Sequence, residues 1–89
     1  PKIKEYFIED VIVFNEREIT TIDKQIVIPD RIVLTKNNNA TIIDYKTGVP
    51  SRRYHQQLNN YEEAVESIGY KVDKKLLIYI NEEIIIEEI

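Results

Sequence analysis

The sequence contains no cysteine, methionine or tryptophan, and only one histidine, two glycines and three prolines. The lack of cysteine excludes disulfides and thiolate metal sites, and it is consistent with the cytoplasmic location that we expect. No apolar run approaches the roughly 20 residues that a membrane-spanning helix needs, so no membrane partner is expected. The chain starts at Pro1 and has no methionine, which favours a piece of a larger protein over an intact translation product.

The overall charge is acidic, with a net charge of −4 and a pI near 5.0. Free-standing DNA-binding domains usually carry a basic surface, so this balance argues against a domain that binds DNA unaided. One stretch differs, because residues 46–56 contain Lys46, Arg52, Arg53 and His55 and no acid. Arg and Lys commonly contact phosphates, and this stretch is where we expect a nucleic-acid backbone to lie.

The 89 residues suffice for one small domain, and 43% of them are hydrophobic. Two β-rich runs, Gln25 to Thr35 and Thr41 to Lys46, flank an asparagine-rich link from Lys36 to Ala40. Asparagine tolerates the backbone angles of tight connections, so these runs predict an antiparallel hairpin.

Asp30, Asp44 and Lys46 form a candidate site on this predicted hairpin. Side chains alternate along a strand, so Asp44 and Lys46 point to one face, and Asp30 lies across from them if register allows. The strand neighbours of Asp30 on that face, Ile28 and Ile32, are apolar, and charges there are costly unless paired or bound to a metal. Mg²⁺ usually takes one or two protein carboxylates, with waters and substrate phosphate completing its shell, so two aspartates suffice.

A helix is predicted over about residues 52–68. Ser51 is a suitable N-cap, and Gly69 stands where glycine commonly follows a helix. Apolar residues recur at steps of four and three, which is typical of an amphipathic helix: Tyr54, Leu58, Tyr61, Val65 and Ile68. Gln57 and Tyr61 are four residues apart and therefore share one side of this helix.

The remaining strand-like segments are Glu9 to Asn15, Ile19 to Ile22, the apolar run Leu76 to Ile80, and Ile84 to Ile89 after a turn at Asn81. A strand that follows a helical crossover usually runs parallel to the strand before it, so Leu76 to Ile80 is expected to lie parallel to the Asp44 strand. These elements predict an α/β (α+β) domain with a mixed sheet in the order β-β-β-α-β-β.

Three motifs stand in order along the chain: PDRIV (Pro29 to Val33), IDYKTG (Ile43 to Gly48) and QLNNY (Gln57 to Tyr61). They resemble the motifs of the PD-(D/E)xK nuclease superfamily in its RecB-like branch. They look most like those of the carboxy-terminal nuclease domain of bacterial UvrD/Rep-type helicases. The resemblance implies a single restriction-endonuclease-like domain over residues 1–89, belonging to a DNA repair or recombination helicase–nuclease.

The resemblance also implies roles for individual residues. Asp30, Asp44 and the backbone carbonyl of Tyr45 would hold Mg²⁺ or Mn²⁺, and Lys46 would assist at the scissile phosphate. Gln57 and Tyr61 would support the lysine or the DNA. The expected activity is metal-dependent hydrolysis of DNA, and the expected DNA contacts are Lys46, Arg52, Arg53, His55 and Gln57.

The same residues also permit other interpretations. Asp44 and Lys46 alone are typical of an ordinary ion pair at a strand end, and His55 alone of a solvated surface residue. The family usually carries a further helix upstream of the sheet, which residues 1–14 do not predict. The alternative functions are a catalytically inactive nuclease-fold module that positions DNA or binds a protein, and a small β-rich domain that self-associates.

Overall fold

The computed structural model describes residues 12–20, 23–35 and 38–89. Within them the chain forms seven strands and one helix, in the order β1 (Ile12–Asn15), β2 (Ile19–Thr20), β3 (Ile26–Val27), β4 (Arg31–Leu34), β5 (Asn39–Lys46), α1 (Arg52–Ser67), β6 (Lys71–Ile80) and β7 (Ile84–Glu88). The predicted strand residues Glu9 to Val11 and those at positions 21–22 lie outside the described part of the chain.

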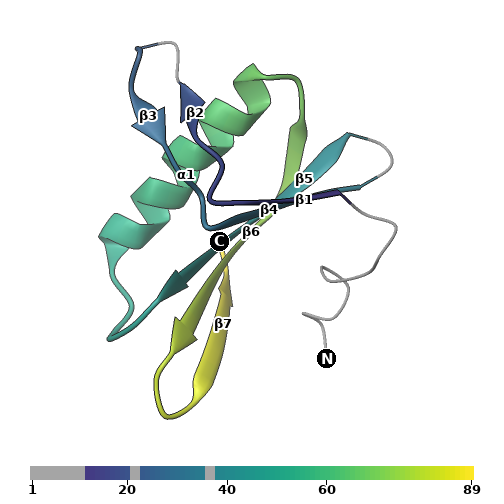
Figure 1. The fold of residues 1–89 in the computed structure, drawn as a ribbon. Coiled ribbons are helices and arrows are strands. Elements are labelled where there is room, and N and C mark those ends of the chain that lie inside the picture. Colours follow the sequence, from purple (N-terminus) through teal and green to yellow (C-terminus); the bar gives the residue numbers. More distant parts are fainter. Residues whose placement is uncertain (1–11, 21–22, 36–37) are drawn as a thin grey trace.

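The main sheet is mixed and has five strands in the order β1-β4-β5-β6-β7 (Figure 1). The β4–β5, β1–β4 and β6–β7 pairs are antiparallel, and β5 and β6 are parallel. Helix α1 connects the two parallel strands and packs mainly against β5 and β6. The coarse prediction of an α+β fold, with a mixed sheet and one helix, is therefore confirmed.

The predicted strand order is wrong in detail, because in the described residues five strands rather than three precede the helix. The run Gln25 to Thr35 was expected to form one strand, but it is divided at Pro29 and Asp30 into β3 and β4. Proline has no backbone N–H to donate to a ladder, which favours a break there. The separated β3 pairs with β2 in a second, two-stranded sheet, and Ile28, expected on an apolar face, is 44% exposed.

Helix α1 starts and ends close to the predicted positions. The Ser51 side chain accepts a hydrogen bond from the backbone N–H of Arg53 at 3.3 Å, and Gly69 has φ +106, the left-handed region that glycine enters without penalty. Ile68 caps the helix and is exposed, and Ala64 joins Leu58, Tyr61 and Val65 on the buried stripe. No helix in the described residues is both long and apolar enough to cross a membrane.

The central strands bury side chains on both faces of the sheet. On the helix side, Ile42 of β5 and Leu77 of β6 are fully buried with Leu58 of α1. On the other side, Ile43 and Leu76 belong to a second buried cluster. Strand β5 is thereby fixed from both sides, so its carboxy-terminal end is a rigid place from which to present charged side chains.

Candidate functional site

Asp44 and Lys46 stand at the end of β5 and point to the helix side of the sheet. The Lys46 Nζ lies 2.9 Å from the Asp44 Oδ2, and the two side chains are only 19% and 3% exposed. They share this face with Ile42 because alternate residues of a strand point the same way. The buried Asp44 carboxylate at the end of a core strand is thus paired with the partly exposed Lys46 amine.

Asp30 lies beside Asp44, one step beyond the paired residues of β4 and β5. Arg31 is the register partner of Ile43, so Asp30 faces Asp44 at the next position. Two hydrogen bonds hold it there: the Asp30 N–H donates to the Asp44 Oδ1 at 3.2 Å, and the Tyr45 N–H donates to the Asp30 Oδ2 at 2.8 Å. A third bond, from the backbone N–H of Glu16 to the Asp30 carbonyl at 3.0 Å, ties this segment to the residue that follows β1.

Burial and the nearby Asp30 carboxyl group change the acidity of Asp44. Its pKa is raised above 3.8, mainly because burial disfavours the charged form, and also because the Asp30 carboxylate is a like charge and a hydrogen-bond partner. Lys46 and the Asp30 N–H act in the opposite direction. A pair of mutually repelling carboxylates is the kind of group that a divalent cation stabilises.

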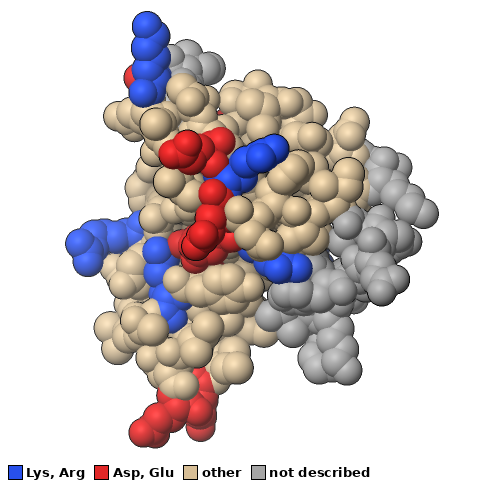
Figure 2. All heavy atoms as spheres, in the orientation of Figure 1, with Lys and Arg blue, Asp and Glu red and all other residues tan. Residues whose placement is uncertain are grey.

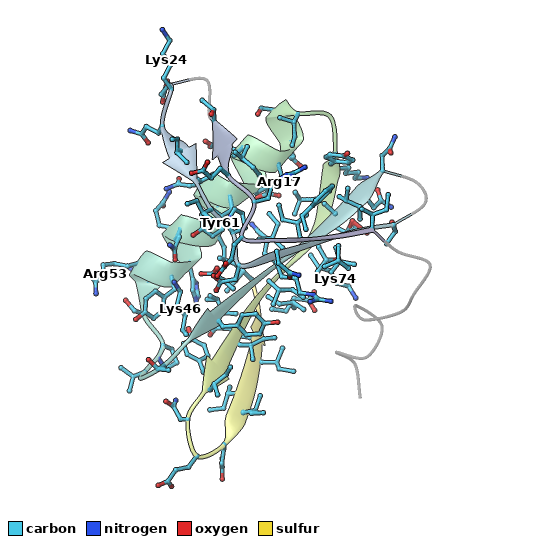
Figure 3. The ribbon with its side chains drawn as sticks, viewed as in Figure 1. Arg17, Lys24, Lys46, Arg53, Tyr61 and Lys74 are labelled. Carbon is cyan, nitrogen blue, oxygen red and sulfur yellow. The ribbon has the colours of Figure 1, made fainter. Side chains whose placement is uncertain are left out.

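Gln57 and Tyr61 bring α1 to the same centre. The Lys46 Nζ donates to the Gln57 Oε1 at 2.6 Å, so this amine is held between the Asp44 carboxylate and the Gln57 amide. Burial, followed by the negative charges of Asp44 and Asp30, raises the pKa of Tyr61 to about 12, and a hydrogen bond from Gln57 lowers it. The phenol is therefore neutral at physiological pH. Figure 3 shows Tyr61 on the helix above Lys46.

Two further contacts of this site had no signal in the sequence. The Lys46 Nζ lies 4.8 Å from the centre of the Tyr54 ring, a cation–π distance. The Asn81 side chain forms a double hydrogen bond with Gly48, accepting from its N–H at 3.0 Å and donating to its carbonyl at 2.9 Å. Asn81 and Gly48 are 33 residues apart, so no local pattern could have predicted that the β6–β7 turn holds the loop after Lys46.

Two open grooves adjoin the centre. The first, called the Lys46 groove, has a volume of about 460 Å³ and is lined by Lys46, Arg53, Tyr54, Gln56, Gln57 and Asn60. The second, called the Asp30 groove, has a volume of about 750 Å³ and is lined by Asn15, Glu16, Arg17, Glu18, Ile28 and Asp30. Figure 3 shows Arg53 and Arg17 on opposite sides of Lys46 and Tyr61.

The residues expected to contact nucleic acid do not all lie in the same groove. Lys46, Arg53 and Gln57 all line the Lys46 groove. Arg52 is exposed and lines neither groove, and His55 places its Nε2 2.8 Å from the Glu87 Oε1 on β7. In Figure 2, Lys and Arg side chains lie on the flank over the start of α1 and also beside the Asp and Glu side chains in the middle of this face. Further acidic side chains lie at the tip of the β6–β7 hairpin.

The oxygen donors at the centre are few. The described residues contain no group of three or more His, Cys, Asp or Glu side chains that could hold a metal ion. Asp30 and Asp44 offer two carboxylates on residues that are hydrogen-bonded to each other through the Asp30 N–H, and the Tyr45 N–H is hydrogen-bonded to the Asp30 carboxylate. Such a donor set fits a hard cation that keeps several waters or completes its shell with a substrate phosphate, as Mg²⁺ commonly does.

Comparison with known proteins gives one fold relationship and no family. No family model matches the chain, and no curated protein matches it. The fold is similar to the crystal structure of a protein called SSO0001, with a TM-score of 0.61 and 22% sequence identity. The match covers 99% of this chain and 47% of that one, so the chain spans about half the length of the protein it matches. At this identity the likeness concerns the fold alone.

Proposed function

We propose that this chain is a metal-dependent deoxyribonuclease domain. It hydrolyses phosphodiester bonds of DNA in a site formed by Asp30, Asp44 and Lys46. The observation that carries the proposal is the contact of two aspartates from neighbouring segments, with a lysine 2.9 Å from one of them. In this assignment the two carboxylates and the Tyr45 carbonyl hold Mg²⁺ or Mn²⁺. The metal supplies an acidified water and stabilises negative charge on the phosphate.

The protein's own groups have separable tasks in this reaction. Lys46 places a positive charge beside the metal ligands, where it orients the attacking water or offsets charge in the transition state. Gln57 fixes the amine by accepting its hydrogen bond at 2.6 Å. Tyr61, whose pKa of about 12 keeps it protonated, supports Gln57 as a neutral hydrogen-bond partner.

The acidic net charge bears on the biological setting. A domain with a net charge of −4 gains little nonspecific attraction to DNA. We therefore assign the delivery of DNA to a larger protein, a DNA repair or recombination helicase of the kind that the motifs resemble. The domain then cuts a strand that its partner holds.

The test combines metal binding with cleavage. Calorimetric titration with Mn²⁺ should show binding to the parent chain and no binding to Asp30→Asn with Asp44→Asn. Asp73→Asn, which removes an exposed carboxylate from β6, is the matched control and should bind as the parent does. Cleavage of a labelled oligodeoxynucleotide should require metal and should be lost with the same pair of substitutions. Equal Mn²⁺ binding by all three proteins would refute the assigned metal site.

One observation favours a second candidate, a non-catalytic interaction module. Strand β7 is at the edge of the main sheet, and its residues Ile84, Ile85 and Ile86 are 68%, 51% and 41% exposed. Edge strands with exposed apolar side chains favour pairing with another chain. Sedimentation of the chain as a stable oligomer, together with an absence of metal-dependent cleavage, would support this candidate instead.

A further inference from the structure

The Lys46 groove continues away from the two aspartates along α1. Its helical residues Arg53, Gln56, Gln57 and Asn60 are spaced by three, four and seven positions, so they form one face of the helix. At a rise of about 1.5 Å per residue this face is roughly 10 Å long. The groove volume of about 460 Å³ is in the range of small-ligand sites, about 300–1,000 Å³. The groove is therefore large enough for one residue of a polymeric substrate.

The Lys46 groove carries mainly positive side chains, whereas the Asp30 groove carries mainly negative ones. Of the described residues, two cations, three amides and a tyrosine line the Lys46 groove, and no carboxylate does. In the described part of the chain, the Asp30 groove is lined by three carboxylates and one cation, Arg17, which lies over the Phe14 ring at 4.9 Å. A phosphate next to the scissile one is attracted to the first groove and repelled from the second.

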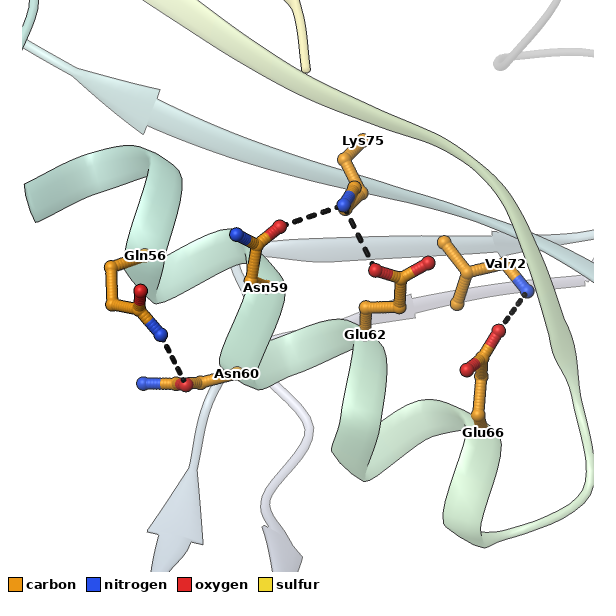
Figure 4. Close-up of polar contacts among 7 residues, drawn as sticks. All are labelled: Gln56, Asn59, Asn60, Glu62, Glu66, Val72 and Lys75. Carbon is orange, nitrogen blue, oxygen red and sulfur yellow. Dashed lines mark hydrogen bonds and ion pairs between the residues drawn. The ribbon is translucent and has the colours of Figure 1, made fainter. Parts of the chain in front are cut away.

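The other polar contacts of α1 leave this face to a ligand. Lys75 of β6 is bonded to Asn59 at 2.7 Å and to Glu62 at 2.9 Å, away from the Lys46 groove (Figure 4). Within the groove, the Gln56 Nε2 donates to the Asn60 Oδ1 at 3.1 Å, and both residues are exposed. Side-chain amides have more donors and acceptors than one such bond uses, so this amide pair presents both kinds of group to a base.

Resting on the proposed nuclease function, we propose that the Lys46 groove binds the nucleotide on one side of the scissile phosphate. Arg53 contacts the phosphate of that nucleotide, and the amide pair of Gln56 and Asn60 contacts its base. The substrate class is then a polynucleotide that the domain holds mainly on one side of the scissile phosphate. Arg and amide side chains are common donors to phosphates and base edges.

The test separates flanking contacts from catalysis by using two substrates at fixed salt concentration. The first is a short oligodeoxynucleotide, and the second is bis(4-nitrophenyl) phosphate, a phosphodiester without nucleotides. Arg53→Ala should raise KM for the oligonucleotide about tenfold, the effect of one charge-assisted hydrogen bond, with kcat kept. The same variant should hydrolyse bis(4-nitrophenyl) phosphate as the parent does. Asn60→Asp, which has the same shape and adds a carboxylate to the groove, should also raise KM for the oligonucleotide alone.

Two comparison variants control for general electrostatics. Arg52→Ala removes the same charge from the preceding residue, which does not line the groove, and should raise KM only about twofold. Lys24→Gln removes an exposed charge from the β2–β3 turn, which lies away from Arg53 in Figure 3, and should leave both substrates unaffected. Equal effects of Arg53→Ala and Arg52→Ala on the oligonucleotide would overturn the groove assignment. So would an equal loss on both substrates in Arg53→Ala.

A failure of the proposed function gives a different result. A parent chain that hydrolyses neither substrate with Mg²⁺ or Mn²⁺ overturns the nuclease, and binding then tests the groove by itself. In that case Kd for a fluorescent oligonucleotide, measured without metal, should rise about tenfold in Arg53→Ala and about twofold in Arg52→Ala. Similar Kd values for the two variants would overturn the groove as well.

Discussion

Replacement of Lys46 by methionine should separate the proposed catalytic role of the lysine from the proposed metal binding. Methionine has nearly the same length and keeps the contact with the Tyr54 ring, but it removes the positive charge. The amine is 2.9 Å from the Asp44 carboxylate, which is a metal ligand in the proposed reaction, so in that reaction the amine is within reach of a phosphate on the same metal. Loss of one such preorganised charged group typically lowers kcat by about 10²–10³-fold, which corresponds to about 2.7–4 kcal/mol.

The same substitution should strengthen metal binding while it weakens the metal-free fold. Removing one partner of a buried ion pair costs about 3–5 kcal/mol, but Lys46 is 19% exposed and Asp44 keeps the hydrogen bond from the Asp30 N–H. We therefore expect a loss of about 1–3 kcal/mol. Without the amine, both carboxylates are available to a cation, so Mn²⁺ should restore more stability to Lys46→Met than it adds to the parent. At about 100 times Kd, bound metal contributes about 2.7 kcal/mol, or roughly 10–20 °C in Tm for a domain of this size.

Three measurements check this reasoning: cleavage rate, Mn²⁺ titration calorimetry, and thermal melts with and without Mn²⁺. Lys71→Met, which removes an exposed lysine at the start of β6, is the matched control and should cleave DNA at the parent rate. Lys46→Arg keeps the charge in a different geometry and should lose less activity than Lys46→Met. Cleavage by Lys46→Met at the parent rate would refute the catalytic role. Loss of Mn²⁺ binding in this variant would show that the lysine organises the metal site.

Three other predictions follow from the same centre. Asp30→Asn should lower the pKa of Tyr61 from about 12, because it removes one of the negative charges that raise it, and NMR of isotope-labelled tyrosine reads this shift. The raised pKa of Asp44 means that its ionisation disfavours folding: the cost is absent below the ordinary pKa of 3.8 and complete above the raised value. Melting curves across that pH range should therefore show a stability that falls more steeply with rising pH in the parent than in Asp44→Asn. Asn81→Ala should cost about 1–2 kcal/mol in chemical denaturation by removing the double hydrogen bond to Gly48, whereas an unchanged midpoint would show that the loop is held in another way.

The elements that the sequence predicted correctly depend on local patterns. Helix α1 has its N-cap at Ser51 and its terminating glycine at Gly69, so its start and end follow from residues within one turn of each boundary. The nearness of Asp30 to Asp44 follows from a short hairpin, in which the link length sets the register. Such features are set by residues close together in the sequence, so local sequence patterns predict them.

The features that were missed depend on distant contacts. The separate pairing of β2 with β3 places Ile19 against the helix, which no alternation within two-residue strands can indicate. The double hydrogen bond between Asn81 and Gly48 joins segments 33 residues apart. His55 lies off the apolar stripe, and its contact with Glu87 depends on where β7 pairs with β6. In each case the tertiary arrangement selects one of several contacts that the local sequence equally permits.

The backbone explains why the two aspartates stay together despite their repulsion. The Asp44 carboxylate accepts a hydrogen bond from the Asp30 N–H, and the Asp30 carboxylate accepts one from the N–H of Tyr45, the residue after Asp44. Separating the two aspartates would therefore break these bonds at the end of the β4–β5 ladder. With Asp44 ionised, the two aspartates and Lys46 carry a local charge of about −1, and a divalent cation would change this to about +1, a suitable sign for a phosphate. The acidic composition of the whole chain is therefore compatible with the proposed phosphodiester chemistry, because in that proposal the attraction for the substrate arises locally, from the bound metal and from the Lys46 groove, where no carboxylate of the described residues lies.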